Sequence, residues 1–414
     1  MTVSTAELIR IFGRIGILSF GGPAAQIALM HRELVEQRDW LSEEQFLRAL
    51  SLCMLLPGPE AMQLATYAGW RLRGVTGGLI AGLLFVLPGA VVIASLALLY
   101  ARFGGVPWVQ AAFLGIKAAV IVIVLQALLK ISKKALTGRS AWVLAGLGFA
   151  AIFALNLPFP LVIATAAAWG FFTSVGGAQP TQSPQAAHPV RTTVIWALLW
   201  LAPLALLSLS GAGLLADIGW FFAKLAVVTF GGAYAVLTYM TQTVVRDMGW
   251  ISTGQMIDAL GLAETTPGPL ILVTQFVAML SGQIAGGTGL ALAAGLVALW
   301  ATFIPCFLWI FLAGPYLDQI AARPRLSGAL SAITAAVVGV ILNLSLWFAL
   351  HVLFARVDRF DAGMLHLPLP DPSSLDLRAV ALMGGAVLVM LVLRAGLATS
   401  LAIMAALGVA LSWI

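Results

Sequence analysis

Residues 20 to 59 read FGGPAAQIALMHRELVEQRDWLSEEQFLRALSLCMLLPGP, and residues 230 to 269 read FGGAYAVLTYMTQTVVRDMGWISTGQMIDALGLAETTPGP. At this fixed offset of 210 residues, 15 of the 40 aligned pairs are identical, with FGG at one end and PGP at the other. Low sequence complexity does not keep such spacing over a long stretch. The pattern therefore indicates an internal duplication.

The duplication extends over nearly the whole chain. After a seven-residue insertion the offset becomes 217, which pairs Pro88 with Pro305 and Gln126 with Asn343. We therefore predict an N-terminal repeat at 1–175, a polar linker with one extra transmembrane helix at 176–215, and a C-terminal repeat at 216–414.

Composition places the chain in a lipid bilayer. Apolar residues make up 61% of the 414 residues, charged residues only 9%, and the mean hydropathy is +1.03. Soluble domains carry about 25% charged residues. We predict an all-α polytopic membrane protein. Five windows have the roughly 20 apolar residues that a span needs, namely 77–101, 106–129, 193–215, 286–313 and 326–354. Shorter apolar runs lie at 141–157, 160–175, 379–393 and 396–413.

Other features narrow the class of protein. Arg10 and Arg14 interrupt the first apolar run, and no small-residue cleavage site follows it, so we do not expect a cleaved signal peptide. The net charge of +6 is not arranged as a basic surface with interleaved aromatic residues, so we expect no nucleic-acid partner. Cys53 and Cys306 are not paired by the repeat, and the four histidines are scattered. We therefore expect no disulfide, metal or other cofactor.

The distribution of basic residues predicts that the two repeats have opposite topology. In the first half Lys130, Lys133, Lys134 and Arg139 follow the second long span, whereas in the second half Arg323 and Arg325 follow the first long span. Basic loops stay in the cytoplasm, so equivalent loops lie on opposite faces and the N-terminus is cytoplasmic. Inverted repeats are a hallmark of secondary transporters, whose substrate site lies at the repeat interface.

The repeated motif region is cut into short pieces. Segments 6–20, 24–38, 43–56 and 60–73 have about 14 residues each, which is roughly 21 Å of helix against a hydrocarbon core of about 30 Å. We predict two re-entrant helical hairpins in each half, with FGG and PGP as their tips. Between the tips, Ser42 with Gln45 and Ser252 with Gln255 have the spacing of a capping box, and a Trp precedes each serine by two positions. This segment reads as an elbow at the membrane surface.

Helix starts deep in a membrane are suited to binding anions. Gly21 and Gly22 allow positive φ, and Pro23 and Pro59 suit the first turn of the helix that follows. Such a helix presents free N–H groups and the positive end of its dipole. The proposed substrate-binding tips are Gly21, Gly22, Pro23, Pro57, Gly58 and Pro59 in the first half and Gly231, Gly232, Pro267, Gly268 and Pro269 in the second. Ala233 replaces the proline in the second half, so strict two-fold symmetry is in doubt.

Intramembrane charges add to this site. Arg14 and Lys224 occupy equivalent positions, six residues before each FGG, and Lys117 lies in the middle of a span. They are candidates for binding the anion, and the alternative is a snorkelling or inter-helix charge. The remaining charges near the motifs are candidates for pairing or for carrying a coupling proton, and for Glu60 the alternative is a partner of a helix dipole. This second set is Glu60, Glu264, Arg48 and Asp258.

The doubled FGG and PGP motifs, at this spacing, resemble the chromate ion transporter family, in its two-domain long-chain type. The resemblance covers nearly the whole chain. It implies chromate efflux through the inner membrane and chromate resistance, with sulfate as the look-alike anion, and a homodimer stays open. Alternatives are a carrier of sulfate or another oxyanion, an anion channel, or an intramembrane enzyme or sensor. No clustered His/Asp/Glu or Ser/His set lies near the tips, and no Walker-type sequence occurs, which argues against an enzyme and against ATP-driven transport.

Overall fold

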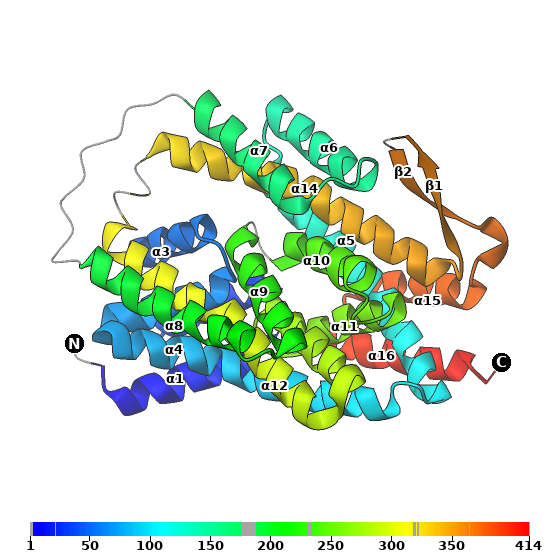
Figure 1. Ribbon diagram of the computed structural model, residues 1–414, viewed down its shortest axis with the longest axis horizontal. Helices are drawn as coiled ribbons and strands as arrows, with labels where there is room; N and C mark the ends of the chain where they lie inside the picture. The colour runs from blue at the N-terminus through cyan, green and yellow to red at the C-terminus, as the bar shows by residue number, and fades with distance from the viewer. Residues whose placement is uncertain are drawn as a thin grey trace. The chain divides into compact units, whose positions relative to one another are not determined.

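The computed structural model describes residues 3–20, 22–174, 188–230, 233–317, 320, 323–363 and 365–413. These residues form helices almost throughout, as predicted (Figure 1). Each of the five predicted long windows coincides with a helix that is long and apolar enough to cross a bilayer. These helices are α4 (Glu60–Phe103), α5 (Pro107–Ala135), α8 (Pro189–Leu209), η3 with α12 and η4 (Leu270–Tyr316) and α14 (Pro324–Leu353).

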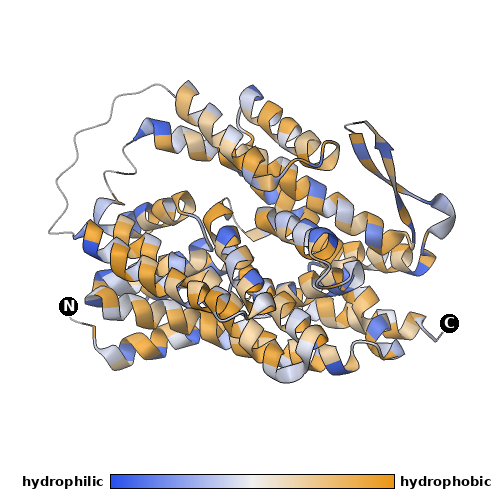
Figure 2. Ribbon diagram, in the orientation of Figure 1, coloured by the Kyte–Doolittle hydropathy of each residue, from blue (hydrophilic) through white to orange (hydrophobic). Residues whose placement is uncertain are grey.

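The helix surfaces are apolar. Figure 2 colours most of the helical ribbon orange, and large side chains such as Phe172 and Leu209 are at least 80% exposed. Monomeric soluble proteins rarely expose contiguous apolar surface on this scale. The exposed apolar faces are therefore those of helices that contact lipid.

The chain divides into two compact units. Unit 1 comprises Met1–Leu98, Thr173–Ala233 and Thr266–Ser327, and unit 2 comprises Leu99–Phe172, Tyr234–Thr265 and Gly328–Ile414. In addition to the long helices, unit 1 contains α1 (Thr5–Leu18), α2 (Gly22–His31), the π-helix η1 (Arg32–Glu36), α3 (Glu43–Leu55) and α9 (Gly213–Val228). Unit 2 contains α6 (Arg139–Phe153), α7 (Phe159–Thr173), α10 (Ala233–Thr241), η2 (Gln242–Asp247), α11 (Thr253–Thr265), α15 (Leu377–Val387), η6 (Leu388–Val392) and α16 (Leu397–Leu411).

Both very long helices of unit 1 are broken near one end. In α4 the break is at Arg73 and Gly74, where Gly74 has φ of +61°. In α12 it is at Gly286 and Gly287, where Gly287 has φ of +79°. The first piece of α4 therefore ends where the sequence predicted, and α1, α2 with η1, and α3 match the other short segments. Whether these pieces form re-entrant hairpins stays a prediction.

Small residues allow the two pieces of α4 to fold against each other. A Cβ placed on Gly69 would lie 2.2 Å from the carbonyl oxygen of Gly77, and a Cβ on Gly77 would lie 2.2 Å from that of Gly69. The two backbones are thus in direct contact, as at small-residue helix interfaces in membranes. The break in α12 has a similar contact, since a Cβ on Gly282 would lie 2.7 Å from the carbonyl oxygen of Leu290.

Unit 2 is organised around α5. Its buried residues Ala118, Ala119 and Val122 form a core with residues of α15 and α16, including Leu401 and Met404. Gly115 of α5 is close enough to α16 that an added Cβ would lie 1.8 Å from the Met404 carbonyl oxygen. The interface therefore depends on close helix approach rather than on large interlocking side chains.

The region between α14 and α15, which lies between two predicted apolar runs, contains the strands that the structure describes. Strands β1 (Val357–Ala362) and β2 (Leu365–Pro370) form an antiparallel hairpin, and the 3-10 turn η5 (Pro372–Ser374) follows. Only two residues separate the strands, and Gly363 has φ of +63°, a conformation that tight hairpins favour. Charged residues in this segment obscured its strand pattern in the sequence.

Both predicted capping boxes are present. Ser42 Oγ accepts from the Gln45 N–H at 3.2 Å, and Gln45 Oε1 accepts from the Ser42 N–H at 3.2 Å. The Ser252 and Gln255 pair makes the same two bonds at 3.2 and 2.8 Å. The sequence therefore identified the starts of α3 and α11 correctly, because a capping box is a purely local motif.

Candidate functional site

The described parts of all four motif tips lie in unit 1. α1 ends at Leu18 and α2 begins at Gly22, whose φ is +76°. At the PGP tips, Gly58 has φ of +118° and Gly268 has φ of +89°. The value at Gly22 agrees with the expectation for that residue, and Gly58 and Gly268 also adopt a conformation that favours glycine. Gly21, Gly231 and Gly232 lie outside the described residues.

Two of the tip prolines lie at or directly before the start of an α-helix, and the other three do not. Pro23 is in the first turn of α2, whereas Pro59 directly precedes α4 and its carbonyl accepts from the Gln63 N–H at 3.1 Å. Pro57, Pro267 and Pro269 lie in the non-helical connections between helices. Since a first helical turn has no intrahelical acceptors for its N–H groups, these starts supply donors.

Reciprocal hydrogen bonds join the two repeats at the tips. The Gly58 N–H donates to the Thr229 carbonyl oxygen at 2.8 Å, and the Gly268 N–H donates to the Ser19 carbonyl oxygen at 2.9 Å. Gly58 and Gly268 are equivalent at the offset of 210, and so are Ser19 and Thr229. Each PGP tip is therefore bonded to the residue before the FGG of the other repeat.

The two residues that accept these bonds are alike in their own surroundings. Ser19 Oγ donates back to the Ile15 carbonyl at 2.5 Å, and Thr229 Oγ1 donates back to the Leu225 carbonyl at 2.6 Å. Both side chains are buried. Each hydroxyl thus satisfies a carbonyl in the last turn of its helix. The Ser19 and Thr229 carbonyls lie past the helix ends and accept from the opposite tip.

Two buried glutamines hold the tips and were not predicted as site residues. Gln26 Nε2 donates to the Gly268 carbonyl at 2.7 Å and to the Ser19 carbonyl at 3.3 Å. Gln63 Nε2 donates to the Pro57 carbonyl at 2.7 Å. The side-chain oxygens of both glutamines are buried without a partner among the described residues. Such acceptors suit a bound water or a hydroxyl donor. A glutamine inside an apolar helix, a few residues after each first-half motif, was the available sequence signal.

One residue of α4 and one residue of α12 lie in close contact with a PGP tip. A Cβ on Gly89 of α4 would lie 2.3 Å from the Pro267 carbonyl oxygen. Gly89 is equivalent to Cys306 of α12 at the offset of 217, and Cys306 Sγ would lie 3.0 Å from a Cβ on Gly58. Each PGP tip is therefore tightly packed against a long helix and has little space for added atoms.

The predicted basic residues near the FGG tips are exposed. The Arg14 side chain is 56% exposed, and its Nη1 lies 3.8 Å from Oε1 of Glu33, which is buried and also bonded to Arg38 at 2.6 Å. Lys224 is exposed on α9. Both cations therefore lie on helices that end near the FGG tips, and Arg14 forms an ion pair with Glu33 of η1.

Lys117 belongs to unit 2 and forms an inter-helix ion pair there. Its Nζ lies 2.8 Å from Oδ1 of Asp258 in α11, and the Tyr100 hydroxyl donates to Oδ2 of the same carboxylate at 2.6 Å. Both charged side chains are at most 15% exposed. Asp258 thus has an ion-pair partner at Oδ1 and a hydrogen-bond donor at Oδ2, and such partners stabilise a buried carboxylate.

The remaining candidates are dispersed. Glu264 of α11 is buried and accepts from the Tyr234 hydroxyl at 2.9 Å. Arg48 pairs with Glu44 one turn away at 2.5 Å on the exposed side of α3. Glu60 is the first residue of α4 and is half-buried.

Several known proteins similar to this chain are described as chromate transport proteins. The family profile named "Chromate transporter" matches residues 6–171 and 216–412. A chromate transport protein of Pseudomonas aeruginosa is 33% identical over 378 residues, which cover 87% of this chain and 85% of that protein. A chromate transport protein of Cupriavidus metallidurans is 32% identical over 346 residues, covering 82% and 81%. A probable chromate transport protein of Synechococcus elongatus is 32% identical over 341 residues, covering 82% and 83%. No solved structure matches the chain.

Proposed function

Because this chain belongs to the chromate transporter family, we propose that it is a secondary transporter that exports chromate from the cytoplasm, with the dianion bound where its four broken tips meet. It is a multi-pass membrane protein whose family transports chromate. The proposal adds the direction, the binding site, alternating access between inverted repeats, and an inner-membrane location with a cytoplasmic N-terminus.

The reciprocal bonds between tips carry the site proposal. Gly58 with Thr229 and Gly268 with Ser19 join the two repeats at equivalent positions, so motifs 210 residues apart meet in one unit. Irregular backbone at membrane depth is tolerated where it lines a cavity or is buried in protein. In this proposal the helix starts beside these bonds would offer further N–H donors and dipole ends to the dianion, an environment that favours an anion.

Charge on the approach to the tips supports the same substrate. Arg14 and Lys224 are equivalent cations, each within two helical turns of an FGG tip. Chromate and sulfate are both tetrahedral dianions, so exposed cations would raise the local concentration of either. The ion pair between Lys117 and Asp258 has a structural role in this proposal, and Glu60 and Glu264 stay as candidates for proton coupling.

The membrane potential can drive the export of a dianion without ATP hydrolysis. An inside-negative potential contributes about 2.3 kcal/mol per charge per 100 mV, hence about 4.6 kcal/mol for two negative charges leaving the cell. The potential alone would therefore hold the internal concentration far below the external one.

Chromate retention in cells tests the proposal. Cells that express the wild-type chain should retain several-fold less chromate than cells with an empty vector. Gly58→Leu should lose this difference, because a side chain at φ of +118° is strained and its Cβ would lie 2.9 Å from Gln63 Nε2. Gly146→Leu is the matched control, since Gly146 has open space around it. Equal retention in wild-type and empty-vector cells would show that the chain does not export chromate.

Purified protein in liposomes separates the alternatives. Saturable chromate flux that sulfate inhibits only weakly supports a chromate carrier, whereas flux that prefers sulfate supports a general oxyanion carrier. Flux that does not saturate supports a channel. Arg14→Ala and Lys224→Ala should each weaken oxyanion binding with the protein still inserted, and unchanged affinity in both would remove these cations from the site.

A further inference from the structure

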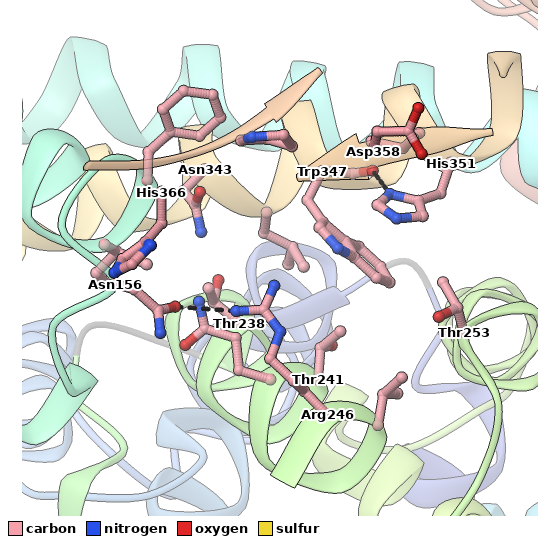
Figure 3. Close-up of a pocket in the computed structure, with 17 residues that line it drawn as sticks. Asn156, Thr238, Thr241, Arg246, Thr253, Asn343, Trp347, His351, Asp358 and His366 are labelled. Atoms are coloured by element: carbon pink, nitrogen blue, oxygen red, sulfur yellow. Dashed lines mark hydrogen bonds between the residues drawn. The ribbon is translucent and has the colours of Figure 1, made fainter. Parts of the chain in front are cut away.

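Unit 2 contains a pocket that the tip site does not use. Its volume is about 270 Å³, and it is lined by the end of α6 and the connection after it, α10, η2, the start of α11, the C-terminal part of α14 and the β1–β2 hairpin (Figure 3). All of its lining residues belong to unit 2, whereas the described tip residues belong to unit 1. The pocket is therefore a separate feature of the fold.

The inner wall of the pocket is rich in neutral polar groups. Thr241 is 4% exposed, and its hydroxyl has no hydrogen-bond partner among the described residues. Thr238 and Asn343 are also buried, at 3% and 6% exposed. An unpartnered buried hydroxyl costs free energy, so its presence beside a cavity indicates a partner that binds there.

The outer part of the pocket carries the charges. Arg246 of η2 is exposed, and its Nη1 donates to Asn156 Oδ1 at 3.0 Å, which fixes the guanidinium at the pocket (Figure 3). Asp358 of β1 also lines the pocket, but it is exposed. Its charge is screened by solvent, whereas the buried hydroxyl and amide groups keep their full strength. His351 and His366 complete the polar lining.

In the first repeat the equivalent corner is occupied by its own side chains. At the offset of 210, Thr241, Arg246 and Thr253 are equivalent to His31, Glu36 and Glu43. In the first repeat these three side chains bond to one another, since His31 Nδ1 lies 3.0 Å from Glu36 and Nε2 lies 2.6 Å from Glu43. The second repeat replaces two acids by an arginine and a threonine, and it has the cavity.

We propose that the pocket around Thr241, Arg246 and Asn343 is a second oxyanion site, which binds a tetrahedral dianion of the sulfate class. The Arg246 guanidinium supplies charge-assisted donors, and Thr241 and Asn343 supply neutral donors from the buried side. The volume leaves room for bridging waters between the anion and these groups. The acidic residues at the equivalent positions of the first repeat would repel such an anion.

Sulfate binding to the purified full-length protein tests this site. Isothermal titration with sodium sulfate, at constant ionic strength, should show two binding events for the wild type. Thr241→Val keeps the side-chain shape and should weaken one event about tenfold, as expected for loss of one hydrogen bond. Arg246→Gln should weaken the same event by at least tenfold. Arg191→Gln, which removes an exposed cation of unit 1, should leave both events unchanged.

A copy of the first repeat provides the strongest variant. The triple change Thr241→His, Arg246→Glu and Thr253→Glu should abolish the event, because the pocket would then be filled by an internal ion cluster. Gly58→Leu should keep this event even if transport is lost, which separates failure at the pocket from failure at the tips. Unchanged sulfate binding in Thr241→Val and Arg246→Gln, or a single event in the wild type that only tip variants affect, would overturn the proposal. If Thr241→Val fails to fold, the exposed Arg246 carries the test alone.

Discussion

Replacing Gly89 by alanine should disable the PGP tip of the second repeat. The added Cβ would lie 2.3 Å from the Pro267 carbonyl oxygen, whereas an ordinary contact begins near 3.4 Å. Either α4 or the tip must therefore move by roughly 1 Å. Since the obstacle is backbone and not a flexible side chain, no change of rotamer relieves the contact.

The magnitude follows from two opposing effects. Overpacking of a tight interior contact costs about 1–3 kcal/mol. Alanine in a helix gains up to about 1 kcal/mol over glycine. We therefore expect a net destabilisation of about 0–3 kcal/mol but a large loss of transport, because a displacement of about 1 Å at a reacting or binding centre can cost about 100-fold.

The assay compares chromate efflux with thermal stability in detergent. Gly89→Ala should lower the efflux rate at least tenfold while the melting temperature falls by only a few degrees. Gly146→Ala, in open space on α6, should keep the wild-type rate and melt no earlier than wild type. Wild-type efflux by Gly89→Ala would refute the proposal that transport depends on the close contact between Gly89 and the PGP tip at Pro267.

Further variants probe the buried polar contacts. Gln26→Leu leaves two tip carbonyls without a side-chain donor and should destabilise the protein by about 1–3 kcal/mol, seen as a lower melting temperature. Lys117→Met should cost about 3–5 kcal/mol by leaving Asp258 unpaired, and the double change with Asp258→Asn should recover most of that loss. The hydrogen bond that His31 Nε2 donates to the Glu43 carboxylate raises the pKa of His31 above its ordinary 6.5, although partial burial opposes the rise. A raised pKa stabilises the folded state below pH 6.5 and loses that effect as the pH rises through the folded-state value, so the melting-temperature advantage of wild type over His31→Gln should shrink between about pH 6 and pH 8.

Each of these expectations has a clear contrary result. An unchanged melting temperature in Gln26→Leu would mean that its hydrogen bonds do not hold the tip. A double variant no more stable than Lys117→Met would mean that the two charges are not coupled. A pH-independent difference between wild type and His31→Gln would mean that the contacts of His31 with Glu36 and Glu43 do not stabilise its charged form.

Local pattern was sufficient for much of this fold. The five long helices, the short pieces around FGG and PGP, and both capping boxes were predicted correctly, because apolar length, glycine, proline and serine act within a few residues. The hairpin between α14 and α15 escaped prediction, since its strands are short and carry charged residues. The offset of 210 also identified which motifs are equivalent, and this needs no knowledge of structure.

Contacts between distant residues were decided only by tertiary structure. The sequence placed Gly58 in a motif and Ser19 directly before one. That each PGP binds the other repeat's helix end depends on how segments about 200 residues apart fold together. The partner of Lys117 was likewise open until packing set α5 beside α11. Gln26 and Gln63 were not predicted as site residues, because the role of a single amide in an apolar helix depends on which carbonyl it binds, and the sequence does not give that contact. The sequence by itself determined where the helices break, since that is local backbone chemistry, whereas the tertiary structure determined what the breaks touch, since that requires surfaces some 200 residues apart to meet.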